Sequence, residues 1–408
     1  MKLIGVKLKN FRGYNNEIII NLDDLTVFVG KNDIGKSTIL EALDIFFNDG
    51  KTCGKLDSND SSVFSENNDV MITAVFDDLP EQIVLDASNI TSLHNEYLLN
   101  ADGFLEIKKV YHNAGKAKIF IVANHPRNEL CCDLLLKTNT ELKRVLDEHN
   151  IQCNNRSANP VVRASIWNHL ADDLQLETTD IDVTKSDTKS IWTKLEEYLP
   201  VYSLFQSDRK NSYEDDEIKD PLQNAVKEII KDEGLIEQFT SIATVITQKL
   251  QEVANRTLEK LREIDHTIAD DLNPQIPNID QLKWADVFKK VSITGDQSIP
   301  INKRGSGTKR LILISFFRAE AEKRLSGNNN TSIIYAIEEP ETSQHADNQK
   351  MLIKAFKELS NSDNTQVILT THSANIVKEL DFSNIRVISE EQNERCIVGV
   401  DSQSLTYP

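Results

Sequence analysis

The sequence predicts an α/β fold in which two parts of one core flank an inserted helical region. Residues 30–37 read Gly-Lys-Asn-Asp-Ile-Gly-Lys-Ser, between an apolar strand-like run at 25–29 and a helix-like run at 38–47. Helix and strand patterns alternate again over 305–380, as expected for a parallel sheet with helical crossovers. Between these parts, apolar residues in 221–270 recur at steps of three or four, which is the helical period.

The first part of the core is expected to consist of short strands around the glycine-containing loop. Alternating or continuous apolar patterns predict strands at 3–9, 17–21, 26–29, 70–76, 103–112 and 118–123. Residues 48–69 are rich in Asn, Asp and Ser, which predicts a loop. Residues 126–198 are mainly helical in composition, and a strand at 200–205 precedes a polar loop at 206–220.

The inserted helical region is expected to end at Asn273-Pro274, because proline cannot continue a helix. It is either a short coiled-coil arm or a helical hairpin packed on the core. Further elements are predicted as a strand at 286–293, a helix at 305–325, a strand at 332–337, a helix at 348–359, a strand at 366–370 and a helix at 374–380. The predicted domains are an N-terminal lobe at 1–125, a helical insertion or dimerisation region at 126–285 and a C-terminal lobe at 286–408.

The composition indicates a globular protein of the cytoplasm. The 408 residues are 39% hydrophobic and 27% charged, which is ordinary for a soluble domain. No apolar stretch approaches the roughly 20 residues of a membrane span, so no membrane partner is expected. The five cysteines lack paired metal-ligand spacing, which favours reduced thiols.

The net charge of −18 argues against non-specific nucleic-acid binding over the whole surface, because phosphate neutralisation needs clustered Lys and Arg. Six basic residues are nevertheless concentrated between Arg304 and Arg324. They form either a solvated helix face or a local phosphate contact. Global charge therefore leaves DNA as a possible partner.

The glycine-containing loop matches the G-x-x-x-x-G-K-[ST] phosphate loop in its required strand–loop–helix context. Gly30 and Gly35 let backbone N–H groups turn toward phosphate oxygens, and the helix N-terminus adds its positive end. Lys36 would reach the β and γ phosphates, while Ser37 would ligate Mg²⁺. The predicted nucleotide contacts are Gly30, Lys31, Asn32, Asp33, Ile34, Gly35, Lys36, Ser37 and Thr38.

Two later apolar strands end in residues suited to phosphate chemistry. Residues 332–341 end in the sequence Glu-Glu-Pro-Glu, in which Glu338 would hold Mg²⁺ and Glu339 would orient or deprotonate the attacking water. Residues 366–373 end in Thr-Thr-His-Ser, and His372 would contact the γ phosphate. The predicted catalytic residues are therefore Lys36, Glu339 and His372.

A second glycine-containing segment, 303–310, precedes a predicted helix and offers a second anion site. It lies before the acidic strand, where ABC-type ATPases carry their signature motif. Two nucleotide-binding elements so far apart in the sequence suggest that the nucleotide is sandwiched between the subunits of a symmetric dimer. Ser306 and Gly307 of one subunit would then complete the site of the other.

Together, residues 9–14 (Lys-Asn-Phe-Arg-Gly-Tyr), 30–37, 305–307, 337–341 and 370–373 resemble the ATPase module of the OLD (overcoming lysogenization defect) family. This family is related to RecF, SMC and other ABC-type ATPases. The resemblance implies an ABC-type P-loop ATPase with a split nucleotide-binding core of mixed and parallel sheets, and ATP and Mg²⁺ as its cofactors. It covers about 1–125 and 285–390.

The resemblance also implies roles for two further residues. Arg12 resembles the early arginine that approaches the nucleotide, although an ordinary strand-edge arginine fits equally well. Gln206 occupies the place of the Mg²⁺-sensing glutamine, and its surroundings do not match the motif. Glu338 stands where ABC ATPases commonly have aspartate, and the Gly-Ser-Gly signature at 305–307 is abbreviated. These departures bear on hydrolysis speed rather than on nucleotide binding.

Full OLD nucleases carry a metal-dependent TOPRIM domain after the ATPase. The segment 373–408 is short for such a domain and lacks an Asp-x-Asp cluster, so nuclease activity in this chain is not expected. The resemblance implies a sensor ATPase of bacterial antiphage systems such as Gabija and Septu, which pair an ATPase with a nuclease activity.

The main hypothesis is a dimeric or higher homo-oligomeric ATP switch that regulates a separate nuclease or other effector. The alternatives are a RecF- or SMC-like DNA-binding repair ATPase, the ATPase part of a longer TOPRIM nuclease, and a nuclease in its own right. A small-molecule kinase is disfavoured, because kinases lack the signature and the paired strand-end acids.

Overall fold

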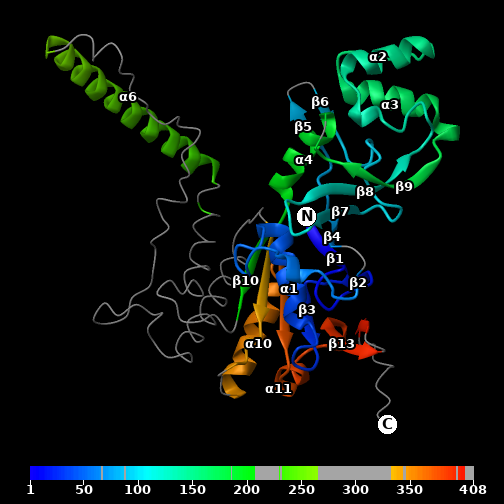
Figure 1. The fold of residues 1–408 in the computed structure, drawn as a ribbon, viewed down its shortest axis with the longest axis vertical. Coiled ribbons are helices and arrows are strands. Elements are labelled where there is room, and N and C mark those ends of the chain that lie inside the picture. Colours follow the sequence, from blue (N-terminus) through cyan, green and yellow to red (C-terminus); the bar gives the residue numbers. More distant parts are fainter. Residues whose placement is uncertain are drawn as a thin grey trace. The chain divides into compact units, whose positions relative to one another are not determined.

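The computed structural model describes residues 1–65, 68–86, 89–184, 186–206, 229, 232–264, 332–342, 346–391 and 394–399. The chain divides into two compact units, one made of 1–209 with 306–408 and the other of 210–305. The second unit contains the helix α6 (Glu233–Ile264), within the region predicted to be helical (Figure 1). Among the described helices, none has the length and apolar composition needed to cross a bilayer.

The first unit contains a mostly parallel sheet. Its strands, in spatial order, are β10 (Val201–Phe205), β11 (Ile333–Glu338), β12 (Thr365–Thr371), β3 (Leu25–Val29), β13 (Ile385–Glu391) and β14 (Glu394–Gly399). Neighbouring strands from β10 to β13 are parallel, and β14 is antiparallel to β13. The predicted parallel sheet is therefore confirmed, with β13 and β14 in addition.

The central strands of this sheet are buried on both faces, which explains their continuous apolar runs. On one face, Ile334 and Ala336 of β11 join the core formed with α1 (Lys36–Asn48). On the other face, Ile333 and Tyr335 pack in the core formed with α10 (Ala346–Ser360). The short helix α11 (Ala374–Lys378) follows β12.

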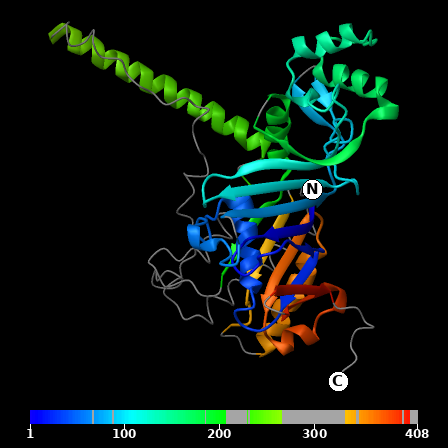
Figure 2. The ribbon, with the colours of Figure 1, turned by 45° about the vertical axis from the view of Figure 1, so that its right-hand side comes forward.

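A second, antiparallel sheet belongs to the same unit, and its strands cross those of the parallel sheet (Figure 2). The strands, in spatial order, are β2 (Ile18–Asn21), β1 (Lys2–Lys9), β4 (Asp69–Asp77), β7 (Leu105–His112), β8 (Lys118–Pro126) and β9 (Leu176–Asp182). Gln366 of β12 joins the two sheets, because it accepts a hydrogen bond from Leu3 N–H at 2.9 Å and donates one to Leu3 O at 2.8 Å. Mixed and parallel sheets were predicted, and the fold class is confirmed.

The remaining elements lie at one end of the antiparallel sheet (Figure 1). They are β5 (Ile83–Asp86), β6 (Asn89–Thr91), α2 (Asn139–Glu148), α3 (Asn159–His169) and α4 (Ser186–Tyr198). Elsewhere among the described residues, 3-10 helices are formed by Ser58–Asp60, Leu134–Leu136, Ala171–Asp173 and Phe382–Asn384. The helices predicted within 126–198 are present, but 176–182 forms the unpredicted strand β9, because pairing with β8 stabilises a largely polar segment. The domain boundaries at 125 and 285 stay predictions.

Candidate nucleotide-binding site

The register of the parallel sheet brings the predicted site residues to one edge. Phe205 pairs with Ile337, Glu338 with Thr370, and Thr371 with Val29. The residues that follow these four parallel strands therefore leave the sheet at the same edge. They are Gln206 after β10, Glu339 after β11, His372 after β12 and Gly30 after β3. Parallel α/β sheets bind ligands at the carboxyl ends of their strands.

Local backbone geometry explains the glycines of the phosphate loop. Gly35 precedes the first residue of α1 with φ +102°, in the left-handed region that costs glycine little. A Cβ at Gly30 would lie 2.9 Å from the carbonyl oxygen of Ile388. The loop ends at Gly35 and α1 begins at Lys36. At this helix N-terminus, backbone N–H groups and the helix dipole favour an anion.

Lys36 lies folded back onto the loop that precedes it. Its side chain is 4% exposed, and Nζ donates hydrogen bonds of 2.9 Å to the carbonyl oxygens of Gly30 and Lys31. Ser37 is half-buried and Thr38 is buried. The ammonium is thus held at the helix start by partners that a phosphate group can replace.

Glu339 and His372 lie next to Lys36. Glu339 Oε1 is 3.8 Å from Lys36 Nζ and 3.2 Å from His372 Nδ1. The backbone of Glu339 has φ +39°, a strained value for a residue with a side chain, and its N–H donates to Thr370 O at 3.1 Å. Glu338 is half-buried at the end of β11. The three residues predicted to be catalytic are therefore in contact.

Glu341 also contacts the histidine, although the sequence interpretation gave it no role. Its Oε1 accepts hydrogen bonds from Thr371 Oγ1 at 2.6 Å and from His372 N–H at 3.0 Å. The same oxygen lies 3.5 Å from His372 Nδ1. Its place in Glu-Glu-Pro-Glu, two positions after Glu339, was the available signal.

Arg12 and Gln206 meet at Glu41, a residue of α1 that the sequence interpretation missed. Arg12 Nε donates to Asp60 Oδ1 at 2.7 Å, and Arg12 Nη1 pairs with Glu41 Oε2. Burial lowers the pKa of Arg12, but Asp60 and Glu41 more than offset this, so the pKa is raised. Gln206 Nε2 donates to Glu41 Oε1 at 3.5 Å. Glu41 thus joins two predicted site residues in the structure.

The strand β14 contributes Arg395 to the outer side of the loop. Its guanidinium lies 5.4 Å from the ring centroid of Tyr14, and Nη2 donates to Asp33 O at 3.3 Å. Tyr14 Oη donates to Gly35 O at 3.0 Å, and burial raises the pKa of Tyr14. Nothing local in the sequence indicates this contact. Ser306 and Gly307, the predicted signature residues, lie outside the described residues.

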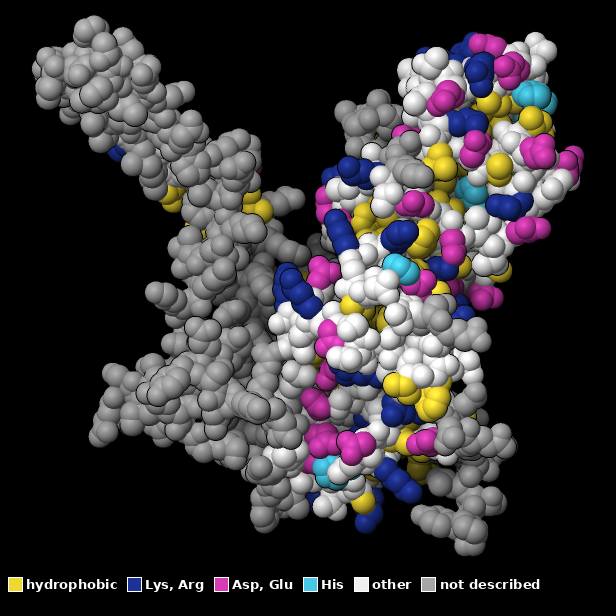
Figure 3. Space-filling view, in the orientation of Figure 1, with side chains coloured by type: hydrophobic (Ala, Val, Ile, Leu, Met, Phe, Trp, Pro, Cys, Tyr) yellow, Lys and Arg dark blue, Asp and Glu magenta, His cyan; other side chains and the backbone are white. Residues whose placement is uncertain are grey.

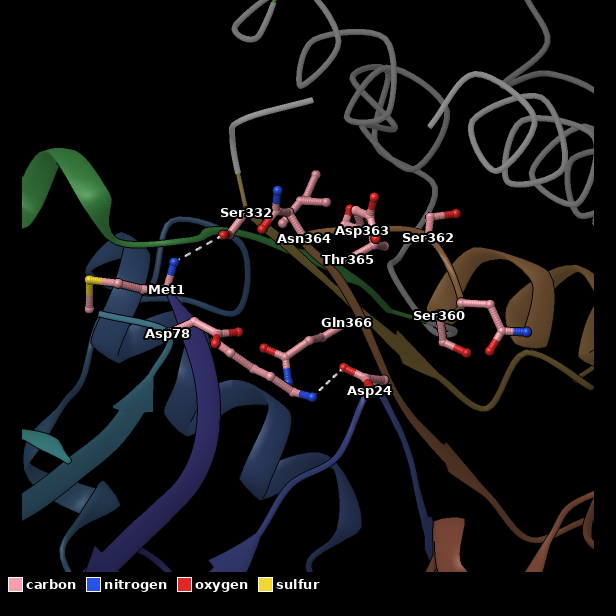
Figure 4. A pocket seen from close by; sticks show the side chains of 13 residues that line it. Met1, Asp24, Asp78, Ser332, Ser360, Ser362, Asp363, Asn364, Thr365 and Gln366 are labelled. Carbon is pink, nitrogen blue, oxygen red and sulfur yellow. Dashed lines mark hydrogen bonds and ion pairs between the residues drawn. The ribbon is translucent and has the colours of Figure 1, made fainter. Parts of the chain in front are cut away.

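Two surface features lie apart from these contacts. On the face drawn in Figure 3, the coloured basic and acidic side chains are interspersed. A polar cleft of about 320 Å³ lies at the opposite edge of the parallel sheet, where β11 and β12 begin. Figure 4 shows its lining, in which the Met1 α-amino group donates to Ser332 Oγ at 3.3 Å and Lys2 pairs with Asp24 at 2.7 Å.

The fold and the strand-end geometry agree with a family comparison. A profile described as an AAA ATPase domain matches residues 1–377. The chain belongs to the AAA ATPase domain family.

Two curated relatives of this AAA ATPase domain are named as nucleases. The chain is 23% identical over 405 residues to endonuclease GajA of Bacillus cereus (strain VD045), covering 97% of this chain and 59% of the relative. It is 24% identical over 196 residues to the OLD nuclease of Thermus scotoductus, covering 48% of this chain and 34% of the relative. The chain thus spans about three fifths of the GajA length. The predicted resemblance to the OLD family is confirmed.

A relative without a nuclease name matches over most of both chains. The ATP/GTP phosphatase of Helicobacter pylori (strain ATCC 700392 / 26695) is 23% identical over 394 residues, covering 92% of this chain and 87% of the relative. Among solved structures, an Smc head bound to the C-winged helix domain of ScpA covers 98% of this chain and 99% of its own, at 15% identity and a TM-score of 0.44.

Proposed function

We propose that this AAA ATPase domain binds Mg²⁺-ATP at the carboxyl edge of the parallel sheet, hydrolyses it, and acts as a dimeric switch for a nuclease or other effector. The observation that carries the proposal is the contact of Lys36 with Glu339 and of Glu339 with His372. A phosphate-binding lysine, a carboxylate and a histidine at one strand edge are suited to orienting a water and a terminal phosphate.

Binding begins at the phosphate loop. The N–H groups at the start of α1 would receive the β and γ phosphates of ATP. Lys36 would exchange its bonds with Gly30 O and Lys31 O for phosphate oxygens. This exchange is favourable because an ammonium–phosphate hydrogen bond is charge-assisted at both ends, whereas a bond to a carbonyl is charged at one end.

Hydrolysis would use the carboxylate beside this lysine. Glu339 would accept a hydrogen bond from the attacking water and orient it, or remove its proton. His372 would donate a hydrogen bond to the γ phosphate and keep its Nδ1 toward the carboxylates. Release of Lys36 to phosphate would separate it from Glu339, which leaves that carboxylate available to the water.

The oxygen-bearing side chains Ser37, Glu338 and Gln206 would hold Mg²⁺. All three supply hard oxygen ligands, which Mg²⁺ prefers. Glu338 ends β11 and Gln206 follows the neighbouring strand β10, whereas Ser37 lies in the first turn of α1. Bound Mg²⁺ would neutralise charge on the β and γ phosphates. Gln206 would have to leave Glu41 to reach the metal. Arg12 would keep its pairs with Glu41 Oε2 and Asp60 when Gln206 leaves, so its approach to the nucleotide would need a separate movement.

The proposed switch depends on nucleotide-binding sites that are each built from two subunits. Ser306 and Gly307 of one subunit would close over the γ phosphate bound by the other, in a dimer or a higher oligomer built through the ATPase units. The names of the GajA and OLD relatives favour a nuclease as the regulated activity, and an antiphage role fits that pairing. A cytoplasmic location fits an ATP-dependent switch.

A trapped complex tests this proposal. The Glu339→Gln variant should bind ATP, fail to hydrolyse it, and elute from size-exclusion chromatography as a dimer or larger species when Mg²⁺-ATP is present. Adding Ser306→Arg should return the ATP-bound protein to monomer. A Glu339→Gln protein that binds ATP and stays monomeric would contradict the dimeric switch.

The second candidate function is a DNA-binding repair ATPase. On the face drawn in Figure 3, the coloured basic and acidic side chains are interspersed, which speaks against a broad DNA-binding surface on that face. Salt-sensitive binding of gapped or plain duplex DNA by the ATP-bound protein would favour this alternative. Mg²⁺- or Mn²⁺-dependent cleavage by the purified chain, lost on substitution of its own acidic residues, would instead establish a nuclease.

A further inference from the structure

Glu341 is a buried carboxylate at the candidate site whose hydrogen bonds go to the histidine segment. The residue is 5% exposed. One oxygen, Oε1, accepts from Thr371 Oγ1 at 2.6 Å and from His372 N–H at 3.0 Å. Thr371 is the last residue of β12 and His372 follows it, so Glu341 links the turn after β11 to the end of the neighbouring strand.

The ring of His372 lies against two carboxylates. Its Nδ1 is 3.2 Å from Glu339 Oε1 and 3.5 Å from Glu341 Oε1. Carboxylates accept hydrogen bonds and do not donate them when ionised. Nδ1 therefore carries a proton in this arrangement, and in the imidazolium form Nε2 carries one as well and can donate to a phosphate on the other side of the ring.

The second oxygen of Glu341 shows that packing alone does not explain the residue. Oε2 is buried and has no hydrogen-bond partner in the structure described here. A buried polar atom without a partner costs free energy. An apolar or hydroxyl side chain would fill this place without that cost, so the carboxylate is retained for what Oε1 does.

We propose that Glu341 is a positioning residue for His372. It fixes both the main chain and the ring of the histidine, holding Nδ1 toward the acidic pair and Nε2 toward the terminal phosphate. The inference rests on the proposed ATPase function. It assigns Glu341 a role in turnover through His372 and no direct contact with ATP.

A double-mutant cycle tests the role in turnover. Removing a partner that orients a functional histidine costs roughly tenfold or more in activity, so Glu341→Ala should lower kcat about tenfold with KM within twofold. In a His372→Ala background the same substitution should change kcat by less than twofold, because the group it orients is absent. Glu341→Gln keeps an acceptor oxygen and should recover most of the lost kcat.

The matched control is Glu106→Ala, which removes a similarly buried carboxylate from β7 of the other sheet, where it pairs with Lys7 at 2.7 Å. It should lower stability without altering kcat of the folded protein. The positioning role would be overturned if the double variant lost kcat by the product of the two single losses. It would also be overturned if Glu341→Ala changed only KM. Either result would leave the ATPase proposal intact.

Nitrogen-15 NMR of the histidine rings separates failure of this inference from failure of the proposed function. The His372 signal, identified by its loss in His372→Ala, should show a protonated Nδ1 at pH 8.5, and Glu341→Ala should lower that population. An unchanged ring signal in Glu341→Ala would refute the inference even if the wild-type chain did not hydrolyse ATP. Absent hydrolysis in the wild-type chain would contradict the proposed function, and with it the role in turnover, whereas a ring signal altered by Glu341→Ala would still support the placement of the ring by Glu341.

Discussion

The ammonium of Lys36 lies 3.8 Å from the carboxylate of Glu339, and its side chain is 4% exposed. Lys36 begins the helix after β3, whereas Glu339 follows β11, and β12 lies between these strands in the sheet. The ammonium also donates hydrogen bonds to two loop carbonyls, those of Gly30 and Lys31. The site therefore holds the Lys36 ammonium against the acid proposed to act on water.

The first prediction concerns this lysine. Lys36→Ala should weaken ATP binding by about 2–5 kcal/mol, the usual cost of truncating one partner of a buried charge pair. Exposed Lys31 supplies the control: Lys31→Ala keeps its backbone carbonyl and should bind ATP nearly as wild type does. Titration with a fluorescent ATP analogue measures both. Equal affinities for the two variants would contradict the role of Lys36.

The second prediction separates crowding from backbone strain at Gly35. A Cβ there would meet Arg395 Nη1 at 2.5 Å, whereas a Cβ at Gly103, with φ +86°, meets nothing within 4 Å. Both substitutions to alanine incur the left-handed penalty of about 1–2 kcal/mol. Gly35→Ala should therefore lower the free energy of unfolding by more than Gly103→Ala, as measured by urea denaturation. Equal losses would show that Arg395 moves away freely.

Much of this site could be predicted from sequence because its parts are local. The phosphate loop and the acids after residues 332–337 each follow an apolar run, and parallel strands place their ends together. Glu41, Glu341 and Arg395 were missed for a different reason. Their contacts join segments distant in the sequence. The acidic run 338–341 marks Glu341 as a candidate, but no local pattern records which side chain it or the other two residues meet.

The strands likewise divide into those that a local apolar run predicts and those that depend on pairing with a distant segment. The apolar runs at β11 and β12 predict buried strands correctly, because burial on both faces requires such runs. β9 and β14 are polar or half-exposed, so their strand form depends on pairing with β8 and β13. Pairing partners depend on the whole chain, which is why these two strands escaped a local interpretation.

A third prediction concerns the buried ion pair between Arg163, a residue of α3, and Glu96. Arg163 donates to Glu96 through Nε at 2.7 Å and Nη2 at 2.8 Å, with side chains 0% and 2% exposed. Arg163→Met leaves a buried carboxylate unpaired and should cost about 3–5 kcal/mol of stability. The exposed pair of Arg127 and Glu177 is the control, and Arg127→Ala should cost about 0–1 kcal/mol. Chemical denaturation compares them; similar losses would contradict the estimate for the buried pair.

The fourth prediction is a pH dependence of stability at His125. Burial lowers its pKa below the ordinary 6.5, despite the hydrogen bond between Nδ1 and Tyr97 O at 2.9 Å. The unfolded chain therefore binds a proton at a higher pH than the folded one, and stability rises with pH between the folded pKa and about 6.5. Acidification through that window should destabilise the protein. The variant His125→Asn keeps a donor for Tyr97 O and removes the titration, so its free energy of unfolding should fall less between pH 8 and pH 5.5. Urea denaturation at both values measures the difference, and parallel pH profiles for the two proteins would show that His125 titrates alike in the folded and unfolded states.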